Sequence, residues 1–124
     1  MKDDGKFLES LAKRFPPSYL LVMNCDQALA ILRAHEAELR DAGVEQLSIF
    51  GSVARREAGS GSDVDVVVRL TPNASKGGFA YFGRLDDLTR RLEELLGCSV
   101  DIVAEPVRKD RLRQNIEREA MLAF

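Results

Sequence analysis

Two aspartates, Asp63 and Asp65, stand at alternate positions where a run of valines begins. Because side chains on a β-strand alternate between its two faces, we expect both carboxylates on one face. Val64, Val66 and Val68 should then lie on the other face. Like charges that close repel each other unless a positive charge lies between them. The pattern therefore indicates a divalent metal site rather than a strand made only for burial.

A third acid, Asp101, lies between apolar residues in residues 98–103, which read as another strand. If that strand lies beside the one carrying Asp65, a spacing of about 5 Å brings Asp101 within reach of the same ion. Three carboxylates suit Mg²⁺, which prefers oxygen ligands and accepts phosphate oxygens. We therefore predict Asp63, Asp65 and Asp101 as catalytic, metal-binding residues. The alternative for Asp101 is an acid at a strand end, exposed to water.

Gly51-Ser52 follows an apolar run at residues 44–50 and precedes a short segment that could form one or two helical turns. A glycine after a strand lets the backbone approach a ligand, and N–H groups at a following helix start can hold phosphate oxygens. Ser52 could cap that helix and donate its hydroxyl to a phosphate, or serve only as a cap. Arg55, and less so Arg56, could neutralise a triphosphate; arginines that only aid solubility are the alternative.

Other phosphate and carboxylate sites fit less well. The sequence holds no G-x-x-x-x-G-K-[ST] stretch, which excludes a P-loop. Gly59-Ser60-Gly61 precedes a strand rather than opening a helix, so it is not a dinucleotide fingerprint. A glycosidase carboxylate pair would leave Gly51-Ser52 unexplained.

The remaining pattern predicts an α/β (α+β) fold, a single domain with a small mixed sheet flanked by helices. The expected helices are residues 27–42, capped by Asp26, then 79–96 and 107–123; the expected strands are 44–50, 63–70 and 98–103. About a dozen residues join the first two strands, so an antiparallel or mixed pairing is expected. His35 lies on an apolar helical stripe and is interpreted as a packed residue rather than a catalytic one.

Length and composition set further bounds. The 124 residues, 45% hydrophobic and 31% charged, suit one globular domain. A net charge of −2 gives no overall attraction to nucleic acid or to anionic membranes. Two distant cysteines, no apolar run of membrane-spanning length and no signal-like start predict a cytoplasmic protein. Residues 6–15 suggest a helix ended by two prolines, and residues 1–22 are interpreted as an extension before a domain at 23–124.

Gly51-Ser52, ten residues, Asp63-Val64-Asp65 and a later Asp101 together resemble the DNA polymerase beta-like nucleotidyltransferase superfamily. The fuller text, residues 50–57 with 62–65, is similar to its minimal, MNT-type branch, from about Asp26 to the C-terminus. Members often have glycine where Arg56 stands.

The resemblance implies a polymerase-beta-like domain that transfers a nucleoside monophosphate, with AMP from ATP expected, to an acceptor hydroxyl and releases pyrophosphate. It implies that Asp63 and Asp65 hold two Mg²⁺ ions, and that Asp101 binds the catalytic ion and orients the acceptor. Two cations about 4 Å apart can stabilise both the attacking and the leaving oxygen. Gly51, Ser52 and Arg55 are the expected nucleotide-binding residues.

The chain has no room for an acceptor-binding domain, so a partner protein is expected to hold part of the acceptor. Minimal members are commonly paired with a HEPN-domain toxin, and the resemblance implies an antitoxin that AMPylates a tyrosine of that toxin. Candidate partner surfaces are the basic last helix and residues 71–78, with a solvated face as the alternative for both. Two other functions stay open: a non-catalytic antitoxin that acts by binding, and an aminoglycoside-type, small-molecule nucleotidyltransferase.

Overall fold

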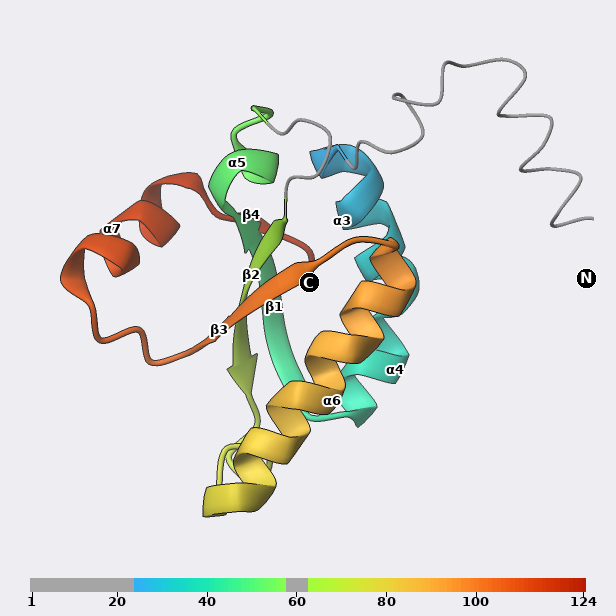
Figure 1. The fold of residues 1–124 in the computed structure, drawn as a ribbon, viewed down its shortest axis with the longest axis vertical. Helices are drawn as coiled ribbons and strands as arrows, with labels where there is room; N and C mark the ends of the chain where they lie inside the picture. Colours follow the sequence, from blue (N-terminus) through green and yellow to red (C-terminus); the bar gives the residue numbers. More distant parts are fainter. Residues whose placement is uncertain (1–23, 58–62) are drawn as a thin grey trace, which may run out of the picture.

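The computed structural model describes residues 24–57 and 63–124, which form a four-stranded sheet between two layers of helices (Figure 1). In chain order the elements are α3 (Cys25–Ala34), α4 (Glu36–Asp41), β1 (Val44–Phe50), α5 (Gly51–Ala54), β2 (Val64–Leu70), α6 (Gly78–Leu96), β3 (Val100–Ala104), α7 (Asp110–Glu119) and β4 (Met121–Leu122). The predicted α/β class, with a small mixed sheet flanked by helices, is confirmed.

The strands lie in the order β3-β2-β1-β4. β1 and β2 pair antiparallel, as the short connection between them predicts. β2 and β3 pair parallel, and α6 provides the long crossover that such a pair needs. The predicted neighbourhood of the second and third strands is therefore confirmed.

The two faces of the sheet bury different side chains. Val64, Val66 and Val68 of β2 join the main core, where they pack with α3, α4 and α6. Val67 points the other way, into a smaller apolar cluster with Phe50 and the α7 residue Ile116. The alternation expected for β2 is thus confirmed for the valines, and Asp65 lies on the face that α7 partly covers.

The first predicted helix is divided in two. α3 ends at Ala34, and the half-buried His35 leaves helical geometry, with φ −107° and ψ 18°, before α4 starts. The N-cap is Asn24, whose side chain accepts from the Gln27 N–H at 2.8 Å, so the prediction of Asp26 as the cap was wrong. An asparagine two positions earlier completes a capping box with Gln27, which Asp26 cannot do.

The last helix is shorter than predicted. α7 begins at Asp110 and ends at Glu119, while the preceding Val107 packs beside the small cluster under α7. Met121 and Leu122 leave the helix and pair with Ile49 and Ser48 of β1. Pairing with an otherwise open strand edge satisfies backbone groups that a continued helix would leave unpaired on β1.

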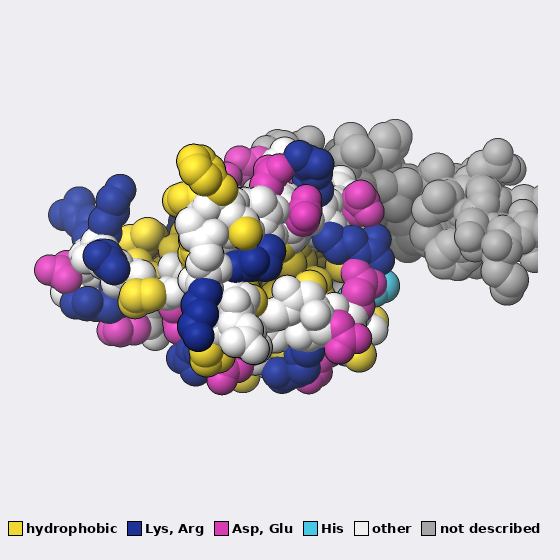
Figure 2. Space-filling view, turned by 90° about the horizontal axis from the view of Figure 1, so that it is seen from below, with side chains coloured by type: hydrophobic (Ala, Val, Ile, Leu, Met, Phe, Trp, Pro, Cys, Tyr) yellow, Lys and Arg dark blue, Asp and Glu magenta, His cyan; other side chains and the backbone are white. Residues whose placement is uncertain are grey.

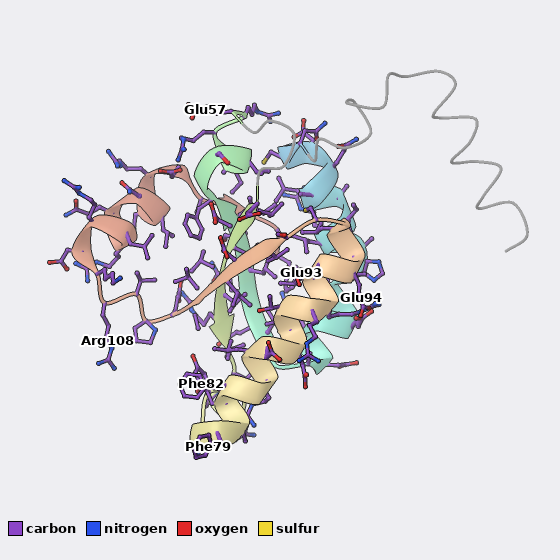
Figure 3. All side chains as sticks on the ribbon, in the orientation of Figure 1. Glu57, Phe79, Phe82, Glu93, Glu94 and Arg108 are labelled. Atoms are coloured by element: carbon purple, nitrogen blue, oxygen red, sulfur yellow. The ribbon has the colours of Figure 1, made fainter. Side chains whose placement is uncertain are left out.

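The amphipathic pattern of α6 is confirmed in its second half only. Leu88 and Leu92 are buried, but Phe82, at the same helical spacing, is 66% exposed, and Phe79 is 96% exposed. Both aromatic rings lie at the start of α6, past the ends of β1 and β2 (Figure 3). The apolar stripe there runs past the end of the core it was expected to cover.

The face seen in Figure 2 mixes acidic and basic side chains, and several Lys and Arg side chains gather over α7. Within the described parts of the chain, every helix is too short or too polar to cross a bilayer. The predicted helix at residues 6–15, the stretch Gly59-Ser60-Gly61 and the proposed boundary after residue 22 lie outside the described residues.

Candidate functional site

The three predicted acids lie at the same end of the β2–β3 pair. Asp65 of β2 lies opposite Asp101 of β3 in the parallel register, and Asp63 directly precedes β2, close enough for its charge to act on Asp65. Asp65 is half-buried, whereas Asp63 and Asp101 are exposed. The fold thus brings together two segments 36 positions apart in the sequence, at an edge that solvent can reach.

Asp65, one of the three aspartates, has a shifted carboxyl pKa. Burial raises the pKa of its carboxyl above the ordinary value, and the neighbouring charges of Asp101 and Asp63 raise it further. The positive charge of Arg55 acts in the opposite direction. The negative charges of Asp101 and Asp63 therefore act on the Asp65 carboxyl, as expected for carboxylates that share one site.

Gly51 lies directly against this carboxylate. Its φ is 76°, in the left-handed region, and a Cβ atom at this position would overlap Asp65 Oδ2. Phe50, the residue before it, is the partner of Asp65 in the β1–β2 register. Glycine is therefore required here both by the backbone conformation and by the close approach to Asp65.

Ser52 and Arg55 lie on the same short turn. α5 begins at Gly51, with Phe50 at the N-cap position and no side-chain cap, so the prediction that Ser52 caps this helix was wrong. Ser52 lies within the turn and is half-buried. The exposed Arg55 donates from Nε to Glu57 at 3.0 Å and from Nη1 to Glu119 at 2.7 Å.

Glu119 is the residue at this site that the sequence reasoning missed. Its Oε2 accepts the Gly51 N–H at 3.1 Å as well as Arg55 Nη1, and its side chain is only 17% exposed. A signal for it exists in the sequence. Glu119 follows the inward-facing Ile116 by three positions, so it lies on the side of α7 that faces the sheet.

Arg56 has a backbone conformation that glycine adopts more easily than other residues. It is the non-glycine residue with positive φ in the described chain, at 61°. Its guanidinium pairs with both oxygens of Asp26, at 3.2 and 3.1 Å. The strained conformation is therefore accompanied by an exposed ion pair between the turn after α5 and the start of α3.

The site offers the donors that a hard divalent cation prefers, three carboxylates at one sheet edge beside a glycine that leaves room for Asp65. Within residues 24–57 and 63–124, no three His, Cys, Asp or Glu side chains are already gathered closely enough to hold an ion. The backbone register supplies adjacent positions for Asp65 and Asp101, and the chemistry of the set fits Mg²⁺.

Comparison with known proteins gives consistent matches. The nucleotidyltransferase domain family matches residues 32–123, which contain the three aspartates, Gly51, Ser52, Arg55 and Glu119. The chain is 33% identical over 103 residues to the protein adenylyltransferase MntA of Thermococcus cleftensis, a match that covers 82% of this chain and 98% of that protein.

Solved structures show the same fold. A chain described as a minimal nucleotidyltransferase superposes with a TM-score of 0.62 and 33% identity, covering 80% of this chain and 95% of the other. The MNT antitoxin in complex with a tri-AMPylated HEPN toxin of Shewanella oneidensis has a TM-score of 0.52 at 18% identity, covering 77% and 71%. This second likeness concerns the fold alone. The matched sequence, the fold and the acidic edge beside Gly51 agree, and the chain belongs to the nucleotidyltransferase domain family.

Proposed function

We propose that this protein transfers AMP from ATP to a hydroxyl group of a partner protein, with a tyrosine of a HEPN-domain toxin as the acceptor. The observation that carries the proposal is the register of Asp65 beside Asp101, at an edge also bounded by Gly51. A protein adenylyltransferase that matches over nearly its whole length, and a structural neighbour in complex with an AMPylated HEPN toxin, support the choice of reaction and partner.

In the proposed reaction, the acceptor hydroxyl oxygen forms a bond to the α-phosphorus of ATP while the bond to the bridging oxygen of the leaving pyrophosphate breaks. The hydroxyl loses its proton to solvent or to a carboxylate, and AMP stays on the acceptor. Two Mg²⁺ ions held by Asp63, Asp65 and Asp101 would stabilise charge on the attacking and leaving oxygens. The protein's own contribution is mainly positioning, because transfer of this kind depends on alignment and on charge stabilisation.

Gly51, Ser52 and Arg55 are proposed to hold the triphosphate. Gly51 supplies backbone beside Asp65 without a side chain in the way. The half-buried Ser52 is placed by the same turn to offer its hydroxyl, and Arg55 contributes a fixed positive charge close enough to act on Asp65. The turn with these three residues lies at the same end of the sheet as the three aspartates. A nucleotide could therefore bind with its phosphates between the turn and the metal ions.

The partner is proposed to complete the acceptor side. The sheet face on which α7 packs is only partly covered by that helix, and the surface of α7 is locally basic (Figure 2). The loop before α6 ends next to the exposed Phe79 and Phe82 (Figure 3). We expect α7 and the loop at residues 71–78 to contact the toxin.

The test combines ATP, Mg²⁺ and a HEPN-domain protein as the proposed partner. We expect AMP on the partner with the wild-type protein and a loss of at least roughly 100-fold in rate with Asp63→Asn or Asp65→Asn, since removing a group that acts in the transition state costs about that much. Neutralisation of the partner that survives both changes would instead identify an antitoxin that acts by binding. Transfer to an aminoglycoside but not to the partner would identify a small-molecule enzyme.

A further inference from the structure

Glu119 differs from the other acids of α7 in its surroundings. It is the last residue of the helix, its side chain is 17% exposed, and one oxygen, Oε2, accepts from both the Gly51 N–H and Arg55 Nη1. Glu117, two positions earlier, is 68% exposed and reaches only Arg113, at 4.0 Å. Burying a carboxylate is costly unless it is paired and hydrogen-bonded, so the contacts of Glu119 are specific rather than incidental.

Those contacts fix the direction of the Arg55 side chain. Glu57 accepts from Nε at 3.0 Å and Glu119 accepts from Nη1 at 2.7 Å. Two anchors on different nitrogens hold the plane of a guanidinium group, whose donors form a rigid fork. Within residues 24–57 and 63–124, the hydrogen bonds of this group use Nε and Nη1 only, which leaves Nη2 for a further acceptor.

The same oxygen of Glu119 also fixes the turn itself. Gly51 is buried, has positive φ and lies against Asp65, so a small shift of its backbone would move it relative to the carboxylates. The hydrogen bond from its N–H ties that backbone to the end of α7, 68 positions away. One oxygen of Glu119 therefore holds both the Gly51 backbone and the Arg55 side chain.

We propose that Glu119 is a positioning residue of the nucleotide site, which holds Gly51 and Arg55 in the orientation that receives the triphosphate. This inference rests on the proposed function. It assigns to Glu119 no contact with the nucleotide and no role in the bond-forming step. What matters in this role is the reach of the side chain and its acceptor oxygen, more than its negative charge.

The test compares length with charge. Glu119→Asp keeps the charge but is one methylene too short to reach both donors, whereas Glu119→Gln keeps the reach and an acceptor oxygen. We expect Glu119→Asp and Glu119→Ala to weaken binding of the β,γ-imido analogue of ATP with Mg²⁺, measured by calorimetry, by roughly 10-fold, the lower end of the effect seen for groups that orient a ligand-binding residue. Glu119→Gln should stay within about 2-fold of wild type, by the same argument. Glu117→Ala, on the exposed side of α7, should leave binding unchanged.

A double-mutant cycle separates positioning from general weakening. If Glu119 acts through Arg55 and Gly51, adding Glu119→Asp to Arg55→Ala should cost clearly less than adding it to wild type. Equal losses in both backgrounds, or Glu119→Asp and Glu119→Ala that bind as tightly as wild type or more tightly, would overturn the proposal; tighter binding would mark Glu119 as a competitor of phosphate. If wild type itself fails to bind the analogue, the proposed function falls together with this inference. Should Glu119→Ala not fold, the Asp and Gln variants still decide.

Discussion

Asp65 lies directly beside Asp101 in the parallel register of β2 and β3, and burial together with the charges of Asp101 and Asp63 raises the pKa of the Asp65 carboxyl. A raised pKa means that the folded protein disfavours the ionised form of this group. The fold thus retains repulsion between carboxylates at this edge of the sheet, as functional sites commonly do. The first prediction follows from this relationship.

Asp65→Asn should abolish AMP transfer and yet stabilise the protein. The amide removes the repulsion from Asp101 and Asp63 but keeps the side-chain size, so we expect the melting temperature at pH 7 to rise by roughly 2–5 °C. The gain should shrink as the pH falls toward the carboxyl's pKa, because wild-type Asp65 then becomes neutral too. Thermal melting of both proteins at several pH values measures this. A variant that melts lower than wild type at pH 7 would contradict it.

Gly51→Ala should damage both the fold and the site. The added Cβ would overlap Asp65 Oδ2, and φ is 76°. We expect a loss of roughly 2–4 kcal/mol in the free energy of unfolding, from strain and overlap together. Gly97→Ala is the matched control, because φ is 70° there and a Cβ would meet nothing within 4 Å.

The control should lose only roughly 1 kcal/mol, the cost of the left-handed conformation. Denaturant unfolding of both variants, with binding of the ATP analogue, provides the comparison. Equal losses in the two variants would show that the approach of Gly51 to Asp65 is not tight.

Arg56 offers a test of backbone strain. With φ at 61°, Arg56→Gly should be more stable than Arg56→Ala by roughly 0.5–1 kcal/mol, the reverse of the order in a helix, because only glycine adopts this conformation without strain. Both variants lose the exposed pair with Asp26 equally, so the difference isolates the backbone. Urea unfolding measures it, and a more stable alanine variant would argue against the left-handed conformation.

Glu38 links α4 to α6 through Arg91, and this link is pH-dependent. The hydrogen bond with Arg91 lowers the pKa of the Glu38 carboxyl from 4.5 to about 2. A lowered folded-state pKa gives stability that is present above the unfolded value and is lost as the pH falls toward the folded one. The stability advantage of wild type over Glu38→Gln should therefore shrink between about pH 4.5 and pH 2.

Denaturant unfolding at several pH values in this window checks the trend. Glu94→Gln is the matched control, because Glu94 also pairs with Arg91, at 3.1 Å, but its side chain is 68% exposed. A difference between wild type and Glu38→Gln that stays constant with pH would show that the pair adds no stability.

Much of this molecule could be predicted because its local patterns and its packing agree. The valines of β2 alternate with Asp65, and burying Val64 and Val66 leaves Asp65 on the opposite face of the strand. The predicted proximity of Asp101 depended on one assumption, that the third strand lies beside the second, and the crossover through α6 satisfies it.

The errors concern contacts between distant segments. Pairing with β1 decides that Met121 and Leu122 form a strand, although the local pattern continues the helix. Phe82 fits the apolar stripe of α6 but lies beyond the core. Glu119 reads as a helix-surface charge until the fold shows that Gly51 and Arg55 lie opposite it. The periodicity of apolar residues along one segment does not indicate which distant segments contact it.

The most direct test of the central claim follows the two ends of ATP separately. The wild-type protein is incubated with Mg²⁺, a HEPN-domain protein as the proposed partner, and ATP labelled either at the α-phosphate or at the γ-phosphate. The proposed transfer predicts that α-label appears on the partner and γ-label is released as pyrophosphate, with neither result in the Asp63→Asn variant. Label from the γ-phosphate on the partner, or no label from either position, would contradict it.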